Sequence, residues 1–133
     1  MDRWRVLVVE SDAAVRATLV EGLRDSGLVV EATDAPDASI DEWHGDVIVT
    51  DTFASPYRQE NVVAYLNELR SRFGAALVVL TAHNGAAVDA AQLPADAVVM
   101  KPFDLEHLID VIGTVGRDTH ERVGPDRHRS AAS

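Results

Sequence analysis

Acidic, hydroxyl-bearing and basic side chains stand directly after four apolar runs of the sequence, where their types suit phosphoryl chemistry. These side chains are Glu10, Ser11 and Asp12, then Asp51, Thr81 and Lys101. Two neighbouring carboxylates repel each other unless a proton or a cation lies between them. Mg²⁺ is a suitable cation because it takes one or two carboxylates, a backbone carbonyl and waters. A lysine ammonium and a threonine hydroxyl can donate to phosphoryl oxygens. Together these groups could move a phosphoryl group onto an aspartate, whose carboxylate is the nucleophile.

The apolar runs have the composition of buried strands. They are short, rich in β-branched residues and apolar at consecutive positions, which is typical of parallel strands covered on both faces. We therefore predict five strands, at residues 5–9, 28–33, 46–50, 76–80 and 97–100.

Segments with helical periodicity lie between the apolar runs. Apolar residues recur every three or four positions in three segments, which we predict as the first, third and fifth helices: 15–23, 61–73 and 104–115. Residues 36–43 predict a short second helix. Residues 85–93 predict an Ala-rich fourth helix that is weakly specified and is expected to be the mobile element. Asp12 and Asp104 stand where N-caps of the first and fifth helices are expected.

This alternation predicts an α/β doubly wound domain, because a parallel sheet needs right-handed helical crossovers between its strands. Ligands of such sheets bind at the carboxyl ends of the strands, near the topological switch point. Glu10 and Asp51 should therefore face each other across a crevice. Thr81 and the only lysine of the chain, Lys101, should lie at the same edge.

Composition narrows the function classes. The 133-residue chain has a length typical of one domain, and 47% of its residues are hydrophobic. Its formal net charge of -10 argues against general nucleic-acid binding, which needs a basic surface. There is no cysteine, so a disulfide or thiolate site is excluded. No signal-like or membrane-length apolar segment is found, and we predict a cytoplasmic protein.

The carboxyl-terminal segment differs from the rest. Residues 117–133 contain four arginines, three acids and almost no apolar residues. We predict a domain over residues 1–116 and a basic, disordered tail over residues 117–133. The tail leaves no room for an attached output domain, so output is expected to pass through a partner.

The segments VLVVESD, DVIVTD, VVLTA and VMKPF, in this order and spacing, resemble the receiver domain of bacterial two-component response regulators over residues 4–116. The resemblance implies a flavodoxin-like (βα)5 fold with sheet order 2-1-3-4-5. It implies that Asp51 accepts a phosphoryl group from a sensor histidine kinase or a phosphotransfer protein with the help of Mg²⁺. Thr81 would then move toward the phosphoryl group and Lys101 would pair with it. Glu10, Asp51 and the backbone carbonyl of Phe53 would be the metal ligands.

Three positions depart from the family pattern. Ser11 stands where the family normally supplies a carboxylate ligand, so weaker Mg²⁺ binding is expected; its hydroxyl or a water would take that place. Pro56 comes one position late after Asp51, which indicates an altered loop. Val98 occupies the place of the family's aromatic switch, so coupling through an aromatic residue there is not expected.

Two functions follow. The first is a stand-alone receiver that is phosphorylated on Asp51 and signals to a downstream protein, through the surface of the fourth helix, fifth strand and fifth helix. The second is a pseudo-receiver, an interaction module independent of phosphorylation. A flavodoxin-like enzyme or nucleotide binder is a distant third, since no glycine-rich loop follows the first strand. We expect no enzymatic activity beyond self-catalysed phosphoryl transfer and autodephosphorylation. Nucleic-acid and membrane partners are not expected, and the chain should be a monomer or weak homodimer.

Overall fold

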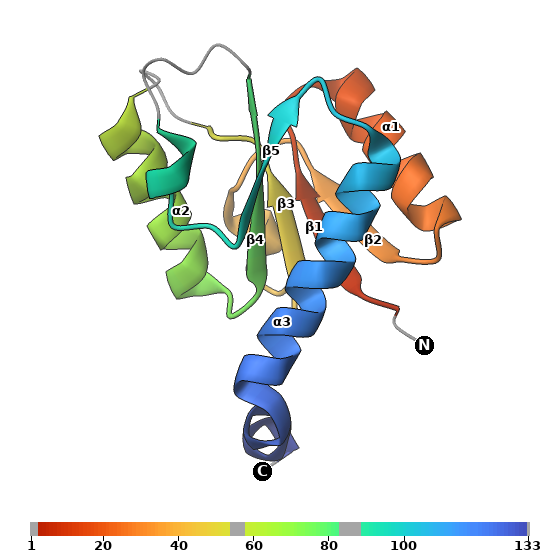
Figure 1. Cartoon of the computed structure of the whole chain (residues 1–133), viewed down its shortest axis with the longest axis vertical. Helices are drawn as coiled ribbons and strands as arrows, with labels where there is room; N and C mark the ends of the chain where they lie inside the picture. The colour runs from red at the N-terminus through yellow and green to blue at the C-terminus, as the bar shows by residue number, and fades with distance from the viewer. Residues whose placement is uncertain (1–2, 54–57, 83–88, 133) are drawn as a thin grey trace.

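The computed structural model describes residues 3–53, 58–82 and 89–132, which form a five-stranded parallel sheet (Figure 1). The strand order is β2-β1-β3-β4-β5, which confirms the predicted flavodoxin-like sheet. Each predicted strand is present, with bounds that differ by at most two residues. The strands are β1 Arg5–Val9, β2 Val29–Thr33, β3 Val47–Thr50, β4 Ala76–Ala82 and β5 Ala97–Lys101.

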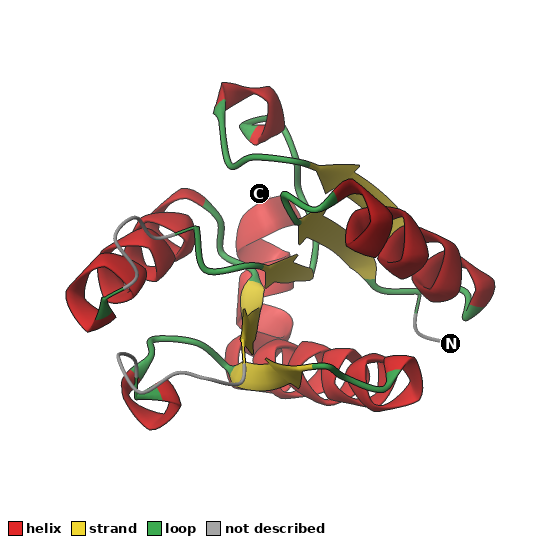
Figure 2. Ribbon diagram, turned by 90° about the horizontal axis from the view of Figure 1, so that it is seen from above, coloured by secondary structure: helices red, strands yellow, loops and turns green. Residues whose placement is uncertain are grey.

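Helices cover both faces of the sheet (Figure 2). Because successive side chains of a strand point to opposite faces, Val6 and Val8 of β1 pack with α1 and α3, whereas Leu7 and Val9 pack with α2. This double burial explains why the strand sequences are apolar at consecutive positions. The helices are α1 Ala13–Asp25, α2 Gln59–Arg72 and α3 Leu105–Ala132.

The expected second helix over residues 36–43 is wrong. The segment forms only one turn of 3-10 helix, η1 (Ala38–Ile40). Asp37 accepts hydrogen bonds from both the backbone N–H and the hydroxyl of Ser39, and these bonds lower the pKa of Asp37. Such local side-chain bonds compete with an α-helix and favour a turn. Trp43 then turns into the core, where only 7% of it is exposed.

The expected fourth helix over residues 85–93 falls partly outside the described residues. Its described part contains one 3-10 turn, η2 (Ala90–Gln92), which Asp89 caps by accepting from the backbone N–H of Ala91. The expectation that this helix is mobile remains a prediction.

The beginnings of α1 and α3 follow the predicted caps. Asp12 accepts from the backbone N–H groups of Ala14 (2.9 Å) and Val15 (3.0 Å). Asp104 accepts from the backbone N–H of Glu106 at 3.1 Å. Each carboxylate satisfies N–H groups that have no partner inside the helix.

The last helix is longer than the predicted segment 104–115. α3 does not end at residue 115 but continues through the expected disordered tail to Ala132. Thr119 is buried, so the packed part of the domain also extends past the predicted boundary. A helix that is already packed needs no new nucleus to continue, and α3 continues although its segment includes Gly124 and Pro125, which disfavour a helix interior. Among the residues that the structure describes, every helix is too short or too polar to traverse a lipid bilayer.

Candidate functional site

Glu10 is the most deeply buried acid at the carboxyl edge of the described sheet, with 1% of its surface exposed. It directly follows β1. Its Oε2 accepts from the backbone N–H of Asp12 at 3.1 Å, and its Oε1 lies 3.3 Å from Lys101 Nζ. The backbone carbonyl of Glu10 accepts from Arg16 Nη1 at 2.7 Å. These bonds hold the carboxylate at the carboxyl end of β1.

Asp51 lies beside Glu10 because β1 and β3 are paired in register up to Val9 and Thr50. The backbone N–H of Asp51 donates to the carbonyl of Val9 at 3.0 Å. Its Oδ1 accepts from the backbone N–H of Thr52 at 2.8 Å and lies 3.8 Å from Lys101 Nζ. The side chain of Asp51 remains 26% exposed, so a reagent can reach it.

Lys101 therefore places one ammonium between two carboxylates from different strands. Its side chain comes from the end of β5 and is 29% exposed. The sequence analysis placed Glu10, Asp51 and Lys101 at one edge of the sheet, and the structure brings them into contact. An ammonium here offsets the repulsion between Glu10 and Asp51, as a metal ion would.

The structure also places the remaining predicted site residues, Thr81, Ser11 and Asp12. Thr81 is buried near the end of β4, opposite Met100 of β5. Ser11 is exposed, and Asp12 caps α1. Pro56, the shifted proline, lies outside the described residues.

Thr50, the residue before Asp51, is supported by a contact that the sequence did not predict. Thr50 Oγ1 donates to the carbonyl of Asp51 at 2.7 Å and lies 2.7 Å from Tyr65 Oη. The ring of Tyr65 also contacts that of Phe53, with 5.7 Å between their centroids. Burial raises the pKa of Tyr65 to about 12, and the charge of Asp51 adds to this shift. In the sequence, Tyr65 stands next to the apolar stripe of α2, which gives no sign of a polar contact.

The donor set for a cation consists of two carboxylates and one carbonyl. Within the described ranges, no three His, Cys, Asp or Glu side chains lie close enough to share a metal ion. Phe53 has a left-handed backbone, with φ of 46°, which is uncommon for a non-glycine residue. Mg²⁺ in proteins commonly uses one or two carboxylates and several waters. Two carboxylates at neighbouring strand ends, Glu10 and Asp51, suit the chemistry of such an ion, with one acid fewer than if Ser11 were aspartate; the role of the Phe53 carbonyl stays a prediction.

Comparison with known proteins identifies the family of this chain. The family model for the response regulator receiver domain matches residues 6–113, which include Glu10, Asp51, Thr81 and Lys101. The chain belongs to this family. The observed sheet order β2-β1-β3-β4-β5 agrees with this assignment.

The relatives are longer regulators. The chain is 32% identical over 115 residues to the DNA-binding transcriptional regulator NtrC of Rhizobium meliloti, covering 81% of this chain and 23% of that protein. It is 27% identical over 129 residues to NtrC of a Bradyrhizobium strain, covering 92% of this chain and 26% of that protein. The chain thus spans about a quarter of the length of the curated relatives it matches.

A solved structure supports the fold. The N-terminal domain of a response regulator/sensory box/GGDEF three-domain protein from Carboxydothermus hydrogenoformans has a TM-score of 0.73 at 23% identity, and the match covers 90% of this chain and 98% of that one. In the present chain, Val98 stands at the position of the family's aromatic residue and is half-buried against the α2 side of the core.

Proposed function

We propose that this receiver domain accepts a phosphoryl group on Asp51 from a sensor histidine kinase or a phosphotransfer protein. One observation carries the proposal: a partly exposed aspartate at the end of β3 lies 3.8 Å from Lys101 Nζ and beside the buried Glu10. An oxygen of the Asp51 carboxylate would attack phosphorus as the P–N bond of the phosphohistidine breaks, and the imidazole would keep that electron pair. Lys101 would then donate to the phosphoryl oxygens.

Glu10, Asp51 and the Phe53 carbonyl are the groups that would hold Mg²⁺. The bound ion would neutralise charge on the acceptor and on the phosphoryl oxygens. Thr81, at the end of the adjacent β4, would supply a hydroxyl donor after phosphorylation. Arg16 would act by holding the backbone carbonyl of Glu10, and Tyr65 by its bond to the hydroxyl of Thr50, which in turn donates to the carbonyl of Asp51.

Phosphorylation is tested with a small-molecule phosphodonor, acetyl phosphate, and Mg²⁺, with the intact mass as the readout. We expect the mass gain of one phosphoryl group in the parent chain and none in Asp51→Asn. A control receiver of known activity verifies the reagent. If the parent gains no mass while the control receiver does, phosphorylation of Asp51 is refuted.

A pseudo-receiver function is the second candidate, and the position of Ser11 favours it. The exposed serine removes an acid from the metal site, and Lys101 already occupies the space between Glu10 and Asp51. Ser11→Asp should lower the dissociation constant for Mg²⁺ in a calorimetric titration, because it adds a negative oxygen ligand. Mg²⁺-dependent phosphorylation of the parent at the rate of the control receiver would exclude the pseudo-receiver.

Output is proposed to pass to a downstream protein across β5 and its neighbours. Met100 on β5 is the one large hydrophobic residue that is clearly exposed among the described residues, at 40%. β5 is also an edge strand, with β4 as its partner in the sheet. An edge strand presents unpaired backbone groups along one side, which suits a protein contact. We further propose that the domain acts in the cytoplasm and catalyses only its own phosphorylation and dephosphorylation.

A further inference from the structure

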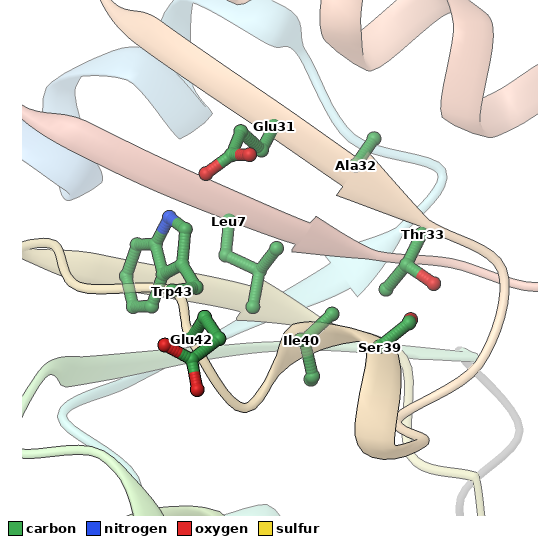
Figure 3. Close-up of a pocket in the computed structure, with 8 residues that line it drawn as sticks. All are labelled: Leu7, Glu31, Ala32, Thr33, Ser39, Ile40, Glu42 and Trp43. Carbon is green, nitrogen blue, oxygen red and sulfur yellow. The ribbon is translucent and has the colours of Figure 1, made fainter.

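A pocket of about 250 Å³ opens between β2 and the segment around η1 (Figure 3). Its floor is apolar and contains Leu7, Ile40 and Trp43, while Glu31 and Glu42 come from its two sides. None of the proposed phosphorylation residues lines it. The pocket is therefore separate from the site at the ends of β1, β3 and β5.

The short η1 turn explains why this pocket exists. Leu7 of β1 pairs in register with Glu31 of β2, and both side chains face the side of the sheet that α2 covers farther along. A full helix over residues 36–43 would cover this part of the sheet, but the three residues of η1 cover less. The hollow beside Leu7 is what remains uncovered.

The charge of the pocket is uncompensated. Neither Glu31 nor Glu42 forms a hydrogen bond or ion pair with any residue that the structure describes, and none of the residues lining the pocket is basic. Two carboxylates beside an apolar floor attract a cation that carries an apolar stem.

Trp43 adds a polar group aimed into the same space. Its ring is 7% exposed and is fixed by an edge contact with Phe73, with centroids 5.9 Å apart. Its indole N–H has no acceptor within the described part of the chain. No fully enclosed side-chain nitrogen or oxygen lacks a partner there, so this N–H must reach open space. Figure 3 shows the indole nitrogen on the side of the ring toward Glu31.

We propose that this pocket binds an arginine side chain of a partner protein. A planar guanidinium carries five N–H donors, so it can donate to a carboxylate on each side of the pocket, which a compact ammonium does less well. The indole N–H can donate to the backbone carbonyl of a bound peptide. The volume is below the range of about 300–1,000 Å³ typical of drug-sized ligands, so it suits one side chain rather than a nucleotide.

The chemistry is tested by titrating three probes into ¹⁵N-labelled protein and following the indole N–H signal of Trp43. The indole signal of Trp4, which packs on Gly116 of α3 away from the pocket, is the internal control. N-acetyl-arginine amide should shift the Trp43 signal saturably. N-acetyl-citrulline amide lacks the charge, and butylguanidine keeps the single charge but lacks the carbonyl, so both should bind more weakly. Equal binding by the citrulline probe would overturn the cation site, and equal binding by butylguanidine would overturn the peptide source.

Two substitutions test the acids without changing the shape of the pocket. Glu31→Gln and Glu42→Gln should each weaken binding of N-acetyl-arginine amide about two- to fivefold, as expected for partly exposed ion pairs. Glu60→Gln is the matched control, because it removes the same charge from an exposed position at the start of α2. The proposal fails if the parent shows no saturable shift, or if the pocket variants bind as tightly as Glu60→Gln.

The site does not depend on phosphorylation. Asp51→Asn should bind N-acetyl-arginine amide as tightly as the parent, because Asp51 does not line the pocket. A failure of the phosphodonor experiment therefore leaves this inference standing, and a failure here leaves the phosphoryl-transfer proposal standing.

Discussion

Lys101→Met removes the ammonium between Glu10 and Asp51 but keeps most of the length of the side chain. Nζ lies 3.3 Å from Glu10 Oε1 and 3.8 Å from Asp51 Oδ1. With an effective dielectric constant of about 20, these distances give gross attractions of about 5 and about 4 kcal/mol. Desolvation of the buried Glu10 and solvent screening of the 29% exposed Lys101 offset much of this. We expect the free energy of unfolding to fall by about 2 kcal/mol, between the values for surface and buried pairs.

The measurement is urea unfolding at pH 7 in a double-mutant cycle with Glu10→Gln. In the Glu10→Gln background, Lys101→Met should lower the free energy of unfolding by less than it does in the parent. The coupling energy between the two substitutions should be about 1–2 kcal/mol. Arg70→Met is the matched control: its ion pair with Asp96 spans 3.5 Å, but Arg70 is 44% exposed. Arg70→Met should lower the free energy of unfolding by less than about 1 kcal/mol. The reasoning is refuted if Lys101→Met costs no more than Arg70→Met, or if the two substitutions of the cycle are additive.

Three further predictions concern stability. Asp12→Ala should lower the free energy of unfolding by about 1 kcal/mol through loss of the α1 cap, whereas Asp12→Asn should change it by a few tenths, as urea unfolding would show. Tyr65→Phe should cost about 1 kcal/mol because the bond to Thr50 is lost. The pKa of Tyr65 rises from 10.0 to about 12 on folding, so the contribution of the protonated phenol to the free energy of unfolding is present below pH 10 and lost as pH rises through 12. In an alkaline absorbance titration, the ionisation step near pH 12 should be missing from Tyr65→Phe. Persistence of that step in the variant would contradict the assignment. Leu66→Ala, at a fully buried position of α2, should cost about 2–5 kcal/mol, and a loss below 1 kcal/mol would contradict that packing.

The sequence predicted the sheet well because burial on both faces leaves a direct signature. Val6 and Leu7 pack on opposite faces of β1, so consecutive apolar residues were enough to place the strand. The spacing of the strands predicted that Glu10, Asp51 and Lys101 meet at one edge. Their order along the sheet came from the resemblance to receiver domains, not from the periodicity.

The errors arose where local side-chain bonds or continued packing decided the outcome. The pattern of residues 36–43 suits a helix, but the bonds between Asp37 and Ser39 favour a turn. The polar composition after residue 116 gave no sign of a longer last helix, whereas α3 continues from a helix that is already packed. The support of Thr50 by Tyr65 depends on the distance between β3 and α2, which no residue type encodes. The pocket beside Trp43 depends in turn on the short η1, so it was also beyond sequence reasoning.

Lys101 has a practical consequence, because it is the only lysine in the chain. Amine-directed reagents can modify only its Nζ and the α-amino terminus, and Nζ is held by two carboxylates at 3.3 and 3.8 Å. The rate of acylation at Lys101 therefore reports how firmly its ammonium is held, without any engineered label. Reductive methylation with ¹³C-formaldehyde would give this site its own NMR signal. The sheet edge where β1, β3 and β5 end thus has a natural chemical handle.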